Sequence, residues 1–203
     1  MATEVKSSFF TETDLAYKEK SNDISDEYLE IINELNESIS KFNLPTAVKC
    51  VYNPTIYARH TFEIYVRKYC NTKKKIMFFG MNPGPWGMSQ TGISGKRFWG
   101  LLKSICGTPE VFFDSSFLYN YLNQQWMKSN GCNLTPGDFR VSEMEDLYNI
   151  CDPIFVKVLK LYEVQIIVAI GKFCETRAQK ALKKYMPYSN IKVTNLARVS
   201  YNI

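Results

Sequence analysis

Two short apolar runs that end in glycine, KIMFFG (residues 75–80) and VQIIVAIG (residues 164–171), constrain the fold of this chain most. Neither run alternates with polar residues, and this pattern is typical of strands that are buried on both faces of a parallel sheet. Segments with helical spacing alternate with such runs along the chain. The pattern therefore predicts an α/β protein with a mostly parallel central sheet.

Apolar residues at helical spacing occupy the segments between the strand-like runs. A helix that begins near Ser25 carries its apolar residues at Tyr28, Leu29, Ile32, Leu35 and Ile39. Further helices are predicted over residues 57–70, 95–106, 142–162 and 173–185, and further strands over residues 48–52, 110–120 and 191–196. Within the long helix, Pro153 predicts a kink or a break.

The length and composition of the chain fit a single domain. The sequence has 203 residues, of which 45% are hydrophobic, and this is enough to bury one core. Residues 1–22 are polar and aperiodic, so we expect a flexible leader followed by one domain at residues 23–203. No apolar stretch reaches the roughly 18 residues that a membrane span requires, so no membrane partner is expected.

Cysteine usage and charge limit the kinds of site that this chain can form. Its six cysteines contain no C-x-x-C pair and it has one histidine, so we expect free thiols and no histidine-based metal site. The formal net charge of +5 fits a polyanionic partner such as nucleic acid. It fits a mildly basic solvated surface equally well.

Three polar or glycine-rich segments follow predicted strands. They are GMNPGPWG after the strand at 75–80, LYNYLNQ at the end of the strand at 110–120, and GKFCETR after the strand at 164–171. In open parallel sheets, ligands bind beyond the carboxyl ends of the strands, so these segments are expected at one ligand-binding edge. The phosphate-loop and dinucleotide patterns fail at the first segment. A purely structural turn is the ordinary alternative there.

The first segment carries a more specific signal. GMNPGPWGMSQTG (residues 80–92) resembles the active-site motif of the uracil-DNA glycosylase superfamily, most closely its single-strand-selective monofunctional branch. SGKRFWGLLKSICGTPEVFF, CNLTP and VQIIVAIGKFCETRAQKAL follow in the same order, so that the resemblance covers about residues 25–196. The resemblance implies a three-layer α/β/α fold, a DNA-repair enzyme in the nucleus, and no metal or cofactor. The implied reaction is hydrolysis of the bond between uracil and deoxyribose.

The resemblance also assigns roles to individual residues. Asn82 would hold the attacking water, the main chain of Gly80 and Met81 would contact the base, and Asn120 would distinguish uracil from cytosine. The remaining candidates would contact DNA: Asn130, Gly131, Asn133, Leu134, Thr135, Lys172 and Arg177. The implied partner is single- or double-stranded DNA that contains uracil or an oxidised pyrimidine, bound by a monomer.

The sequence departs from the family pattern at two places. After Gly92 the family continues with a Pro-Phe-Gly segment whose phenylalanine stacks on the extruded base, whereas here Ile93 leads directly into SGKRFWG. After IKVTNL the family has a His-Pro-Ser-Pro motif, whereas this sequence reads ARVSYNI. We therefore expect an incomplete version of the fold with weak or no activity. The alternatives are a catalytically inactive DNA-binding variant of the family and an unrelated nucleotide-binding α/β protein.

Overall fold

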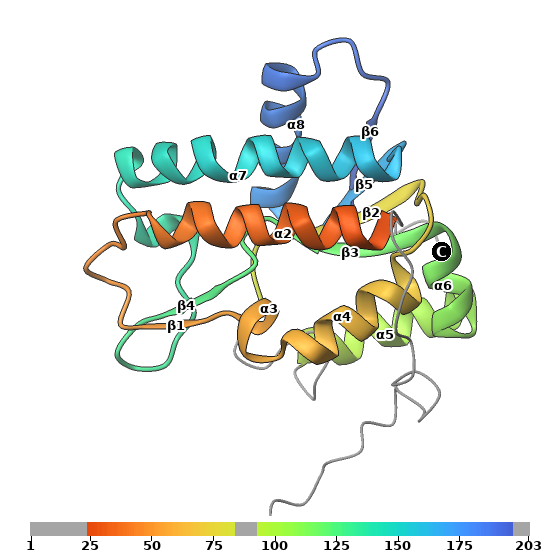
Figure 1. Ribbon diagram of the computed structural model, residues 1–203, viewed down its shortest axis with the longest axis horizontal. Helices are drawn as coiled ribbons and strands as arrows, with labels where there is room; N and C mark the ends of the chain where they lie inside the picture. The colour runs from red at the N-terminus through yellow and green to blue at the C-terminus, as the bar shows by residue number, and fades with distance from the viewer. Residues whose placement is uncertain (1–23, 84–92, 197–203) are drawn as a thin grey trace, which may run out of the picture.

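A four-stranded parallel sheet forms the centre of the protein in the computed structural model, which describes residues 24–83 and 93–196 (Figure 1). The strands are β2 (Ile76–Gly80), β3 (Ser116–Asn120), β5 (Ile166–Ala169) and β6 (Lys192–Asn195). They lie in the order β3-β2-β5-β6, and all neighbouring pairs are parallel. The predicted α/β class is confirmed. The predicted leader, residues 1–22, lies outside the described residues.

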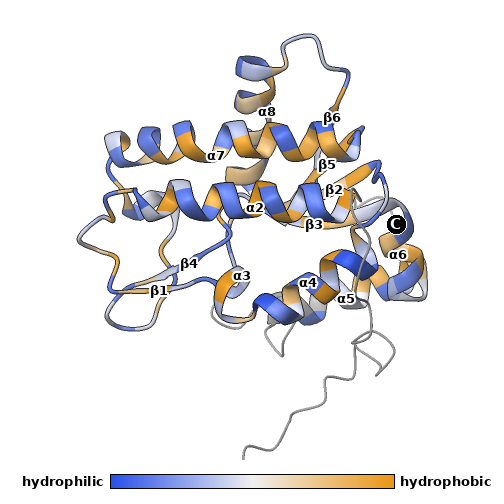
Figure 2. Cartoon of the chain, in the orientation of Figure 1, coloured by the Kyte–Doolittle hydropathy of each residue, from blue (hydrophilic) through white to orange (hydrophobic). Residues whose placement is uncertain are grey.

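Seven α-helices of the described residues surround this sheet. They are α2 (Ile24–Ser40), α3 (Pro54–Tyr57), α4 (Arg59–Tyr69), α5 (Ile93–Cys106), α6 (Pro109–Ser115), α7 (Val141–Tyr162) and α8 (Lys172–Tyr185). In Figure 2, α2 and α7 alternate between hydrophilic and hydrophobic residues, as amphipathic helices do when they cover a sheet. None of the described helices is both long and apolar enough to cross a membrane.

Successive residues of β2 point into two separate hydrophobic clusters. On one face, Phe79 stacks on Phe155 of α7 with ring centroids 4.5 Å apart, in a cluster that also contains residues of α2 and α8. On the other face, Phe78 packs 5.1 Å from Phe112 of α6 and 5.6 Å from Phe98 of α5. The sheet is therefore covered by helices on both faces, and the fold has three layers.

The predicted strand over residues 110–120 is wrong in its first half, because Pro109–Ser115 forms helix α6. The helix begins with a recognisable cap. The side chain of Thr108 accepts a hydrogen bond from the backbone N–H of Val111, and Pro109 occupies the first turn, where no N–H is needed. At the other end of α6, the buried ammonium group of Lys74 donates to the carbonyls of Phe113 and Asp114. This contact satisfies two carbonyls of the last turn.

Two further features differ from the sequence prediction. Helix α7 continues from Val141 to Tyr162 with Pro153 inside it, so the predicted break does not occur. A short antiparallel ribbon, which the sequence did not predict, pairs β1 (Cys50–Tyr52) with β4 (Gln125–Met127) beside the main sheet. Because β4 contains only three residues, it shows no measurable alternation in the sequence.

Candidate active site

Strands β2 and β5 lie side by side, and the chain leaves their carboxyl ends toward opposite faces of the sheet. After β2 the chain continues through α5 and α6, which pack on one face, and after β5 it continues through α8, which packs on the other. Such a point, where connections diverge, is the usual ligand site of an open parallel sheet. Asn82 lies at this point, two residues after the end of β2.

Asn120 lies directly opposite Gly80, because the last residues of β3 and β2 are partners in the parallel ladder. The Asn120 side chain lies so close to the backbone of Gly80 that its Oδ1 atom would be 2.4 Å from a Cβ atom added at Gly80. Real Cβ atoms do not tolerate this distance, so the Asn120 side chain occupies space that only a glycine leaves open. The structure therefore gives the glycine at position 80 a specific reason.

The main-chain carbonyls of Gly80 and Met81 are already engaged. The carbonyl of Gly80 accepts a hydrogen bond from Tyr121 N–H at 2.9 Å, and that of Met81 accepts one from Leu122 N–H at 2.9 Å. These bonds extend the β2–β3 pairing past the strands and hold the carboxyl edge of the sheet rigid. A base contact from this segment would accordingly come from an N–H group.

The side chain of Asn82 forms a reciprocal amide pair with Asn133. The Nδ2 atom of Asn82 donates to Oδ1 of Asn133 at 3.0 Å, and Nδ2 of Asn133 donates to Oδ1 of Asn82 at 3.1 Å. Both residues are half-buried. The sequence analysis predicted Asn133 as a DNA contact. No local pattern linked it to Asn82, which lies 51 positions earlier in the chain.

Asn133 belongs to the loop that follows β4, and this loop holds most of the other predicted DNA contacts. Asn130, Gly131 and Thr135 are exposed in it. Gly131 has a φ angle of 79°, which favours glycine because a Cβ atom would be strained there. The predicted DNA contact at Leu134 is wrong, because this residue is 3% exposed and its side chain packs in the core.

The same loop is closed by a polar cluster around Asp138. Lys128 donates to Asp138 at 2.5 Å, and both the backbone N–H and the hydroxyl of Thr135 donate to its other oxygen. These donors, with Lys128 the largest contributor, lower the pKa of Asp138 to about 2. The contribution of this cluster to stability is therefore complete above the ordinary carboxyl pKa and is lost only as the pH falls toward about 2.

Lys172 and Arg177 were both expected to contact DNA from α8, and the structure separates them. The Lys172 side chain is 80% exposed at the first residue of the helix, although its ammonium group also pairs with Glu175. The predicted DNA contact at Arg177 is wrong, because this side chain points inward. Its guanidinium donates to Asp152 at 2.8 Å and lies 3.9 Å from the centroid of the Tyr148 ring. An arginine used in this way is not available to a phosphate on the surface.

The buried pair of Arg177 and Asp152 is connected to the carboxyl edge of the sheet through Tyr121. The hydroxyl of Tyr121, which follows β3 directly, donates to Asp152 at 2.6 Å. Burial raises the pKa of Asp152, while the hydrogen bond from Tyr121 and the charge of Arg177 oppose this increase. The sequence did not predict this network, because its three residues belong to separate elements and share no motif. Tyr121 follows β3, Asp152 lies on α7 and Arg177 lies on α8.

The next residues of that loop are also buried in polar contacts. Asn123 donates to Oδ1 of Asn36 on α2 at 2.6 Å, and Asn53 donates to the same oxygen at 2.7 Å. Gln124 accepts from the indole N–H of Trp126 at 3.0 Å. Residues 121–124 therefore join the sheet to α2 and to the ribbon, and they form a support of the site.

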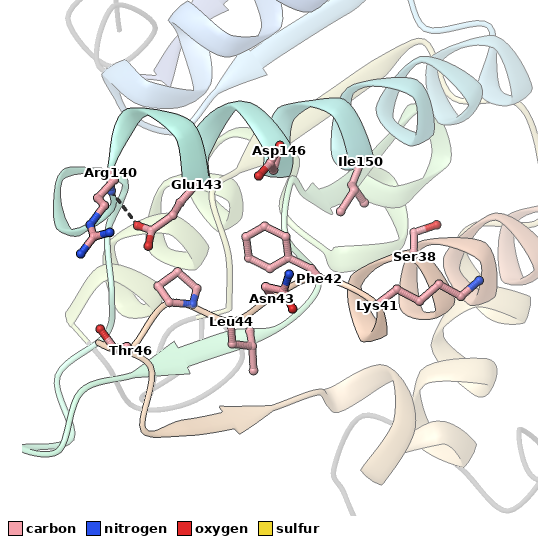
Figure 3. Close-up of a pocket in the computed structure, with 11 residues that line it drawn as sticks. Ser38, Lys41, Phe42, Asn43, Leu44, Thr46, Arg140, Glu143, Asp146 and Ile150 are labelled. Atoms are coloured by element: carbon pink, nitrogen blue, oxygen red, sulfur yellow. Dashed lines mark hydrogen bonds between the residues drawn. The ribbon is translucent and has the colours of Figure 1, made fainter.

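An open hollow of about 650 Å³ lies between the end of α2 and the start of α7 (Figure 3). Charges of both signs line it, with Lys41 and Arg140 opposed by Glu143 and Asp146. Figure 3 shows the backbone N–H of Arg140 bonded to the Glu143 carboxylate, which is a helix-start contact. None of the predicted site residues lines this hollow, so the candidate active site is the carboxyl edge of the sheet.

Comparison with known proteins identifies relatives of this chain. No family model matches the sequence. A curated protein of Rattus norvegicus, "Single-strand selective monofunctional uracil-DNA glycosylase", is 31% identical over an alignment of 204 positions that covers 81% of this chain and 73% of the rat protein. The Mus musculus protein of the same name matches equally. The Bos taurus protein is 31% identical over 75% of this chain and 71% of its own length.

A solved structure has the same fold. The crystal structure of wild-type SMUG2 from Pedobacter heparinus superposes with a TM-score of 0.63 at 16% identity, covering 83% of this chain and 86% of that one. The fold and the curated relatives together place the chain in the uracil-DNA glycosylase class. Within that class, the chain belongs to the family of single-strand selective monofunctional uracil-DNA glycosylases, enzymes of DNA base-excision repair that hydrolyse N-glycosyl bonds.

Proposed function

We propose that this chain releases uracil from DNA at the carboxyl edge of β2 and β3, with Asn82 as the catalytic residue and Asn120 as the base-selecting residue. The observation that carries the proposal is the pairing of Gly80 with Asn120 next to Asn82, at the divergence point between β2 and β5. Two primary amides near the ends of adjacent strands can both form hydrogen bonds at one small polar ring that lies between them.

The chemistry of an amide fits one particular step. The oxygen of the attacking water forms a bond to C1′ while the C1′–N1 bond breaks, the bonding electrons leave with uracil, and the water proton passes to solvent. Such reactions have an oxocarbenium-like transition state, so the water must be held in position more than it must be deprotonated. An amide accepts hydrogen bonds but is not a strong base, and Asn82 can therefore orient the water.

Base selection follows from the donors and acceptors of Asn120. Its amide can donate to O4 of uracil and accept from N3–H, whereas cytosine presents the opposite groups at both positions. A buried polar group left without a partner costs about 1–3 kcal/mol, which disfavours cytosine. The base must leave the stack to reach this edge, because its glycosidic bond is inaccessible in a duplex.

Gly80→Ala should weaken uracil selection, because the new Cβ atom would lie 2.4 Å from Oδ1 of Asn120 and displace that amide. We expect the preference for uracil over cytosine to fall roughly 30-fold, which corresponds to about 2 kcal/mol, the centre of the range for one unpaired group. The comparison is uracil and cytosine release from matched oligonucleotides. Gly100→Ala is the control, since a Cβ atom at Gly100 meets nothing within 4 Å. An unchanged preference would separate Gly80 from base selection.

The DNA backbone would lie along the exposed residues near this edge. Asn130, Gly131 and Thr135 of the β4 loop are exposed, and Lys172 stands at the first turn of α8. The N-terminal turn of a helix presents unpaired N–H groups and a positive dipole end, which favours phosphate. Of the charged candidates, Lys172 fits this role and the buried Arg177 does not.

We further propose a substrate range and a location for the activity. The substrates are uracil and oxidised pyrimidines in single- and double-stranded DNA, and the site of action is the nucleus, where the chain works as a monomer. The activity is weak, because Gly92 is followed directly by Ile93 and no aromatic residue stands where the family has its stacking phenylalanine. Stacking of a base on an aromatic ring contributes about 1–3 kcal/mol.

The test is release of uracil from a labelled single-stranded oligonucleotide by the full chain, with the cytosine oligonucleotide as the blank. We expect slow release, and faster release from a chimera that carries the family Pro-Phe-Gly segment after Gly92. The gain should be about fivefold to 150-fold, as one stacking contact predicts. No release by either protein would exclude glycosylase activity and favour the DNA-binding variant.

A further inference from the structure

The reciprocal amide pair between Asn82 and Asn133 concerns the reacting group itself. We infer that Asn133 is a positioning residue, which fixes the carboxamide of Asn82 in the orientation that holds the attacking water. This inference rests on the proposed function of Asn82. It gives Asn133 a role other than contact with DNA.

The pair constrains Asn82 without using all its hydrogen-bonding groups. Each primary amide offers two donor hydrogens and an oxygen with two lone pairs. The bonds of 3.0 Å and 3.1 Å use one hydrogen and one lone pair of each residue. Asn82 therefore keeps one hydrogen and one lone pair for a water molecule, while rotation of its amide about the terminal torsion is blocked. That torsion is otherwise broad and has two nearly equivalent states.

Both partners of the pair are attached to rigid backbone. Asn82 lies two residues beyond β2 and immediately before Pro83, and a residue before proline is restricted to extended conformations. Asn133 forms an antiparallel bridge with Met127, and the next residue donates its N–H to the Trp126 carbonyl at 2.8 Å. The carbonyl of Cys132 accepts from Lys128 at 2.9 Å. Thus β4 holds Asn133 in place, and the amide of Asn133 orients the amide of Asn82 beyond β2.

The arrangement explains why the ribbon of β1 and β4 stands beside the main sheet. The sheet alone would leave Asn82 at the end of a strand with a freely rotating amide. The loop after β4 supplies a second fixed point, at a sequence separation of 51 residues. Catalytic groups gain from such support because a displacement of about 1 Å can reduce a rate roughly 100-fold.

The test is a double-mutant cycle in the full chain, with Asn82→Ala, Asn133→Ala and the combination. We measure the single-turnover rate of uracil release and the Kd for single-stranded DNA. Asn133→Ala should lower the rate roughly 10- to 100-fold while the Kd changes less than about twofold. In the Asn82→Ala background, Asn133→Ala should cause no further loss, because Asn133 acts through Asn82.

A second Asn133 variant and an NMR measurement separate the loss of the amide pair from a loss of folding or of activity. Asn133→Leu keeps the branched shape and the number of heavy atoms of the side chain without its amide, so it should reproduce the rate of Asn133→Ala if the fold is retained. In amide NMR spectra of the full chain, the side-chain Nδ2 signal of Asn82 should shift in both variants, whether or not the chain is active. Asn149→Ala, which replaces an exposed asparagine on α7, is the matched control for rate and spectrum.

Separate outcomes overturn the inference and the proposed function. A weaker Kd with an unchanged rate in both Asn133 variants would make Asn133 a DNA contact instead. Rate losses that multiply in the double variant would show that Asn133 acts independently of Asn82. An Asn82 signal that does not move would disprove the pair itself. A wild-type chain that releases no uracil would overturn the proposed function, with the spectrum still reporting on the pair.

Discussion

Asn82→Ala should reduce uracil release on the order of 10²- to 10³-fold, because the variant loses the only side chain that we assign to the attacking water. Binding of single-stranded DNA should change little, since the half-buried amide of Asn82 is uncharged and is bonded to Asn133. The loss should therefore appear in the single-turnover rate and leave the Kd nearly unchanged. The measurement is a single-turnover assay with enzyme in excess over a labelled uracil oligonucleotide.

Stability must be separated from catalysis in this variant. Removing the Asn82 amide leaves the Asn133 amide without its partner, which costs about 1 kcal/mol for a half-buried group. Thermal denaturation of Asn82→Ala and of the surface control Asn149→Ala should therefore differ only slightly. If Asn82→Ala folds and releases uracil at the wild-type rate, another group positions the water and our assignment is wrong.

Arg177→Met should destabilise the protein by about 3–5 kcal/mol, because it leaves Asp152 buried without a counter-ion. Asp152 is 1% exposed and lies 2.8 Å from the Arg177 guanidinium. Methionine retains much of the length of the arginine, so the change mainly removes the charge and the contact with Tyr148. The free energy of unfolding from urea titrations at neutral pH measures this effect.

The double variant Arg177→Met with Asp152→Asn is the matched control. It removes both charges of the pair, and the asparagine oxygen can still accept the hydrogen bond from Tyr121. Much of the lost stability should return, since replacing both partners of a buried ion pair is far less costly than removing one. Equal destabilisation in the single and double variants would mean that packing, and not the unpaired charge, causes the loss.

The single variant should also respond to pH in a defined direction. Burial already raises the pKa of Asp152, and the loss of Arg177 removes one of the groups that oppose this increase. A carboxyl group with a raised pKa in the folded state gains stability on protonation, and that gain is lost as the pH rises through the folded pKa. The deficit of Arg177→Met should therefore shrink as the pH falls from neutrality toward the ordinary carboxyl pKa.

The pairing of Asn120 with Gly80 shows how far local sequence patterns reach. The apolar run at residues 75–80 predicted a buried strand, and the segment ending at Asn120 predicted a neighbouring one. Both strands exist, and their last residues are ladder partners. The prediction succeeded because the carboxyl ends of parallel strands meet at one edge, so that residues at strand ends converge without further information.

Helix α6 shows where a local pattern was present but outweighed. The aromatic residues of Pro109–Ser115 favoured a strand, whereas Thr108 and Pro109 form an ordinary helix start. The cap determined the conformation, and Lys74 completed the helix end from a segment 39 residues away. The start was therefore visible in the sequence, but the contact at the end was not.

The sequence by itself determined the parallel sheet, its covering helices and the meeting of Asn82 and Asn120 near one edge. These features depend on hydrophobic periodicity, which short segments encode, and on the fact that the carboxyl ends of parallel strands meet at one edge. Only the tertiary structure decided that Asn133 pairs with Asn82 and that Arg177 turns inward to Asp152. A polar side chain chooses between solvent and a buried partner according to which groups the fold brings within about 3 Å. For Asn82 and Asn133, those groups are 51 residues apart and follow strands of separate sheets, so no local pattern could specify them.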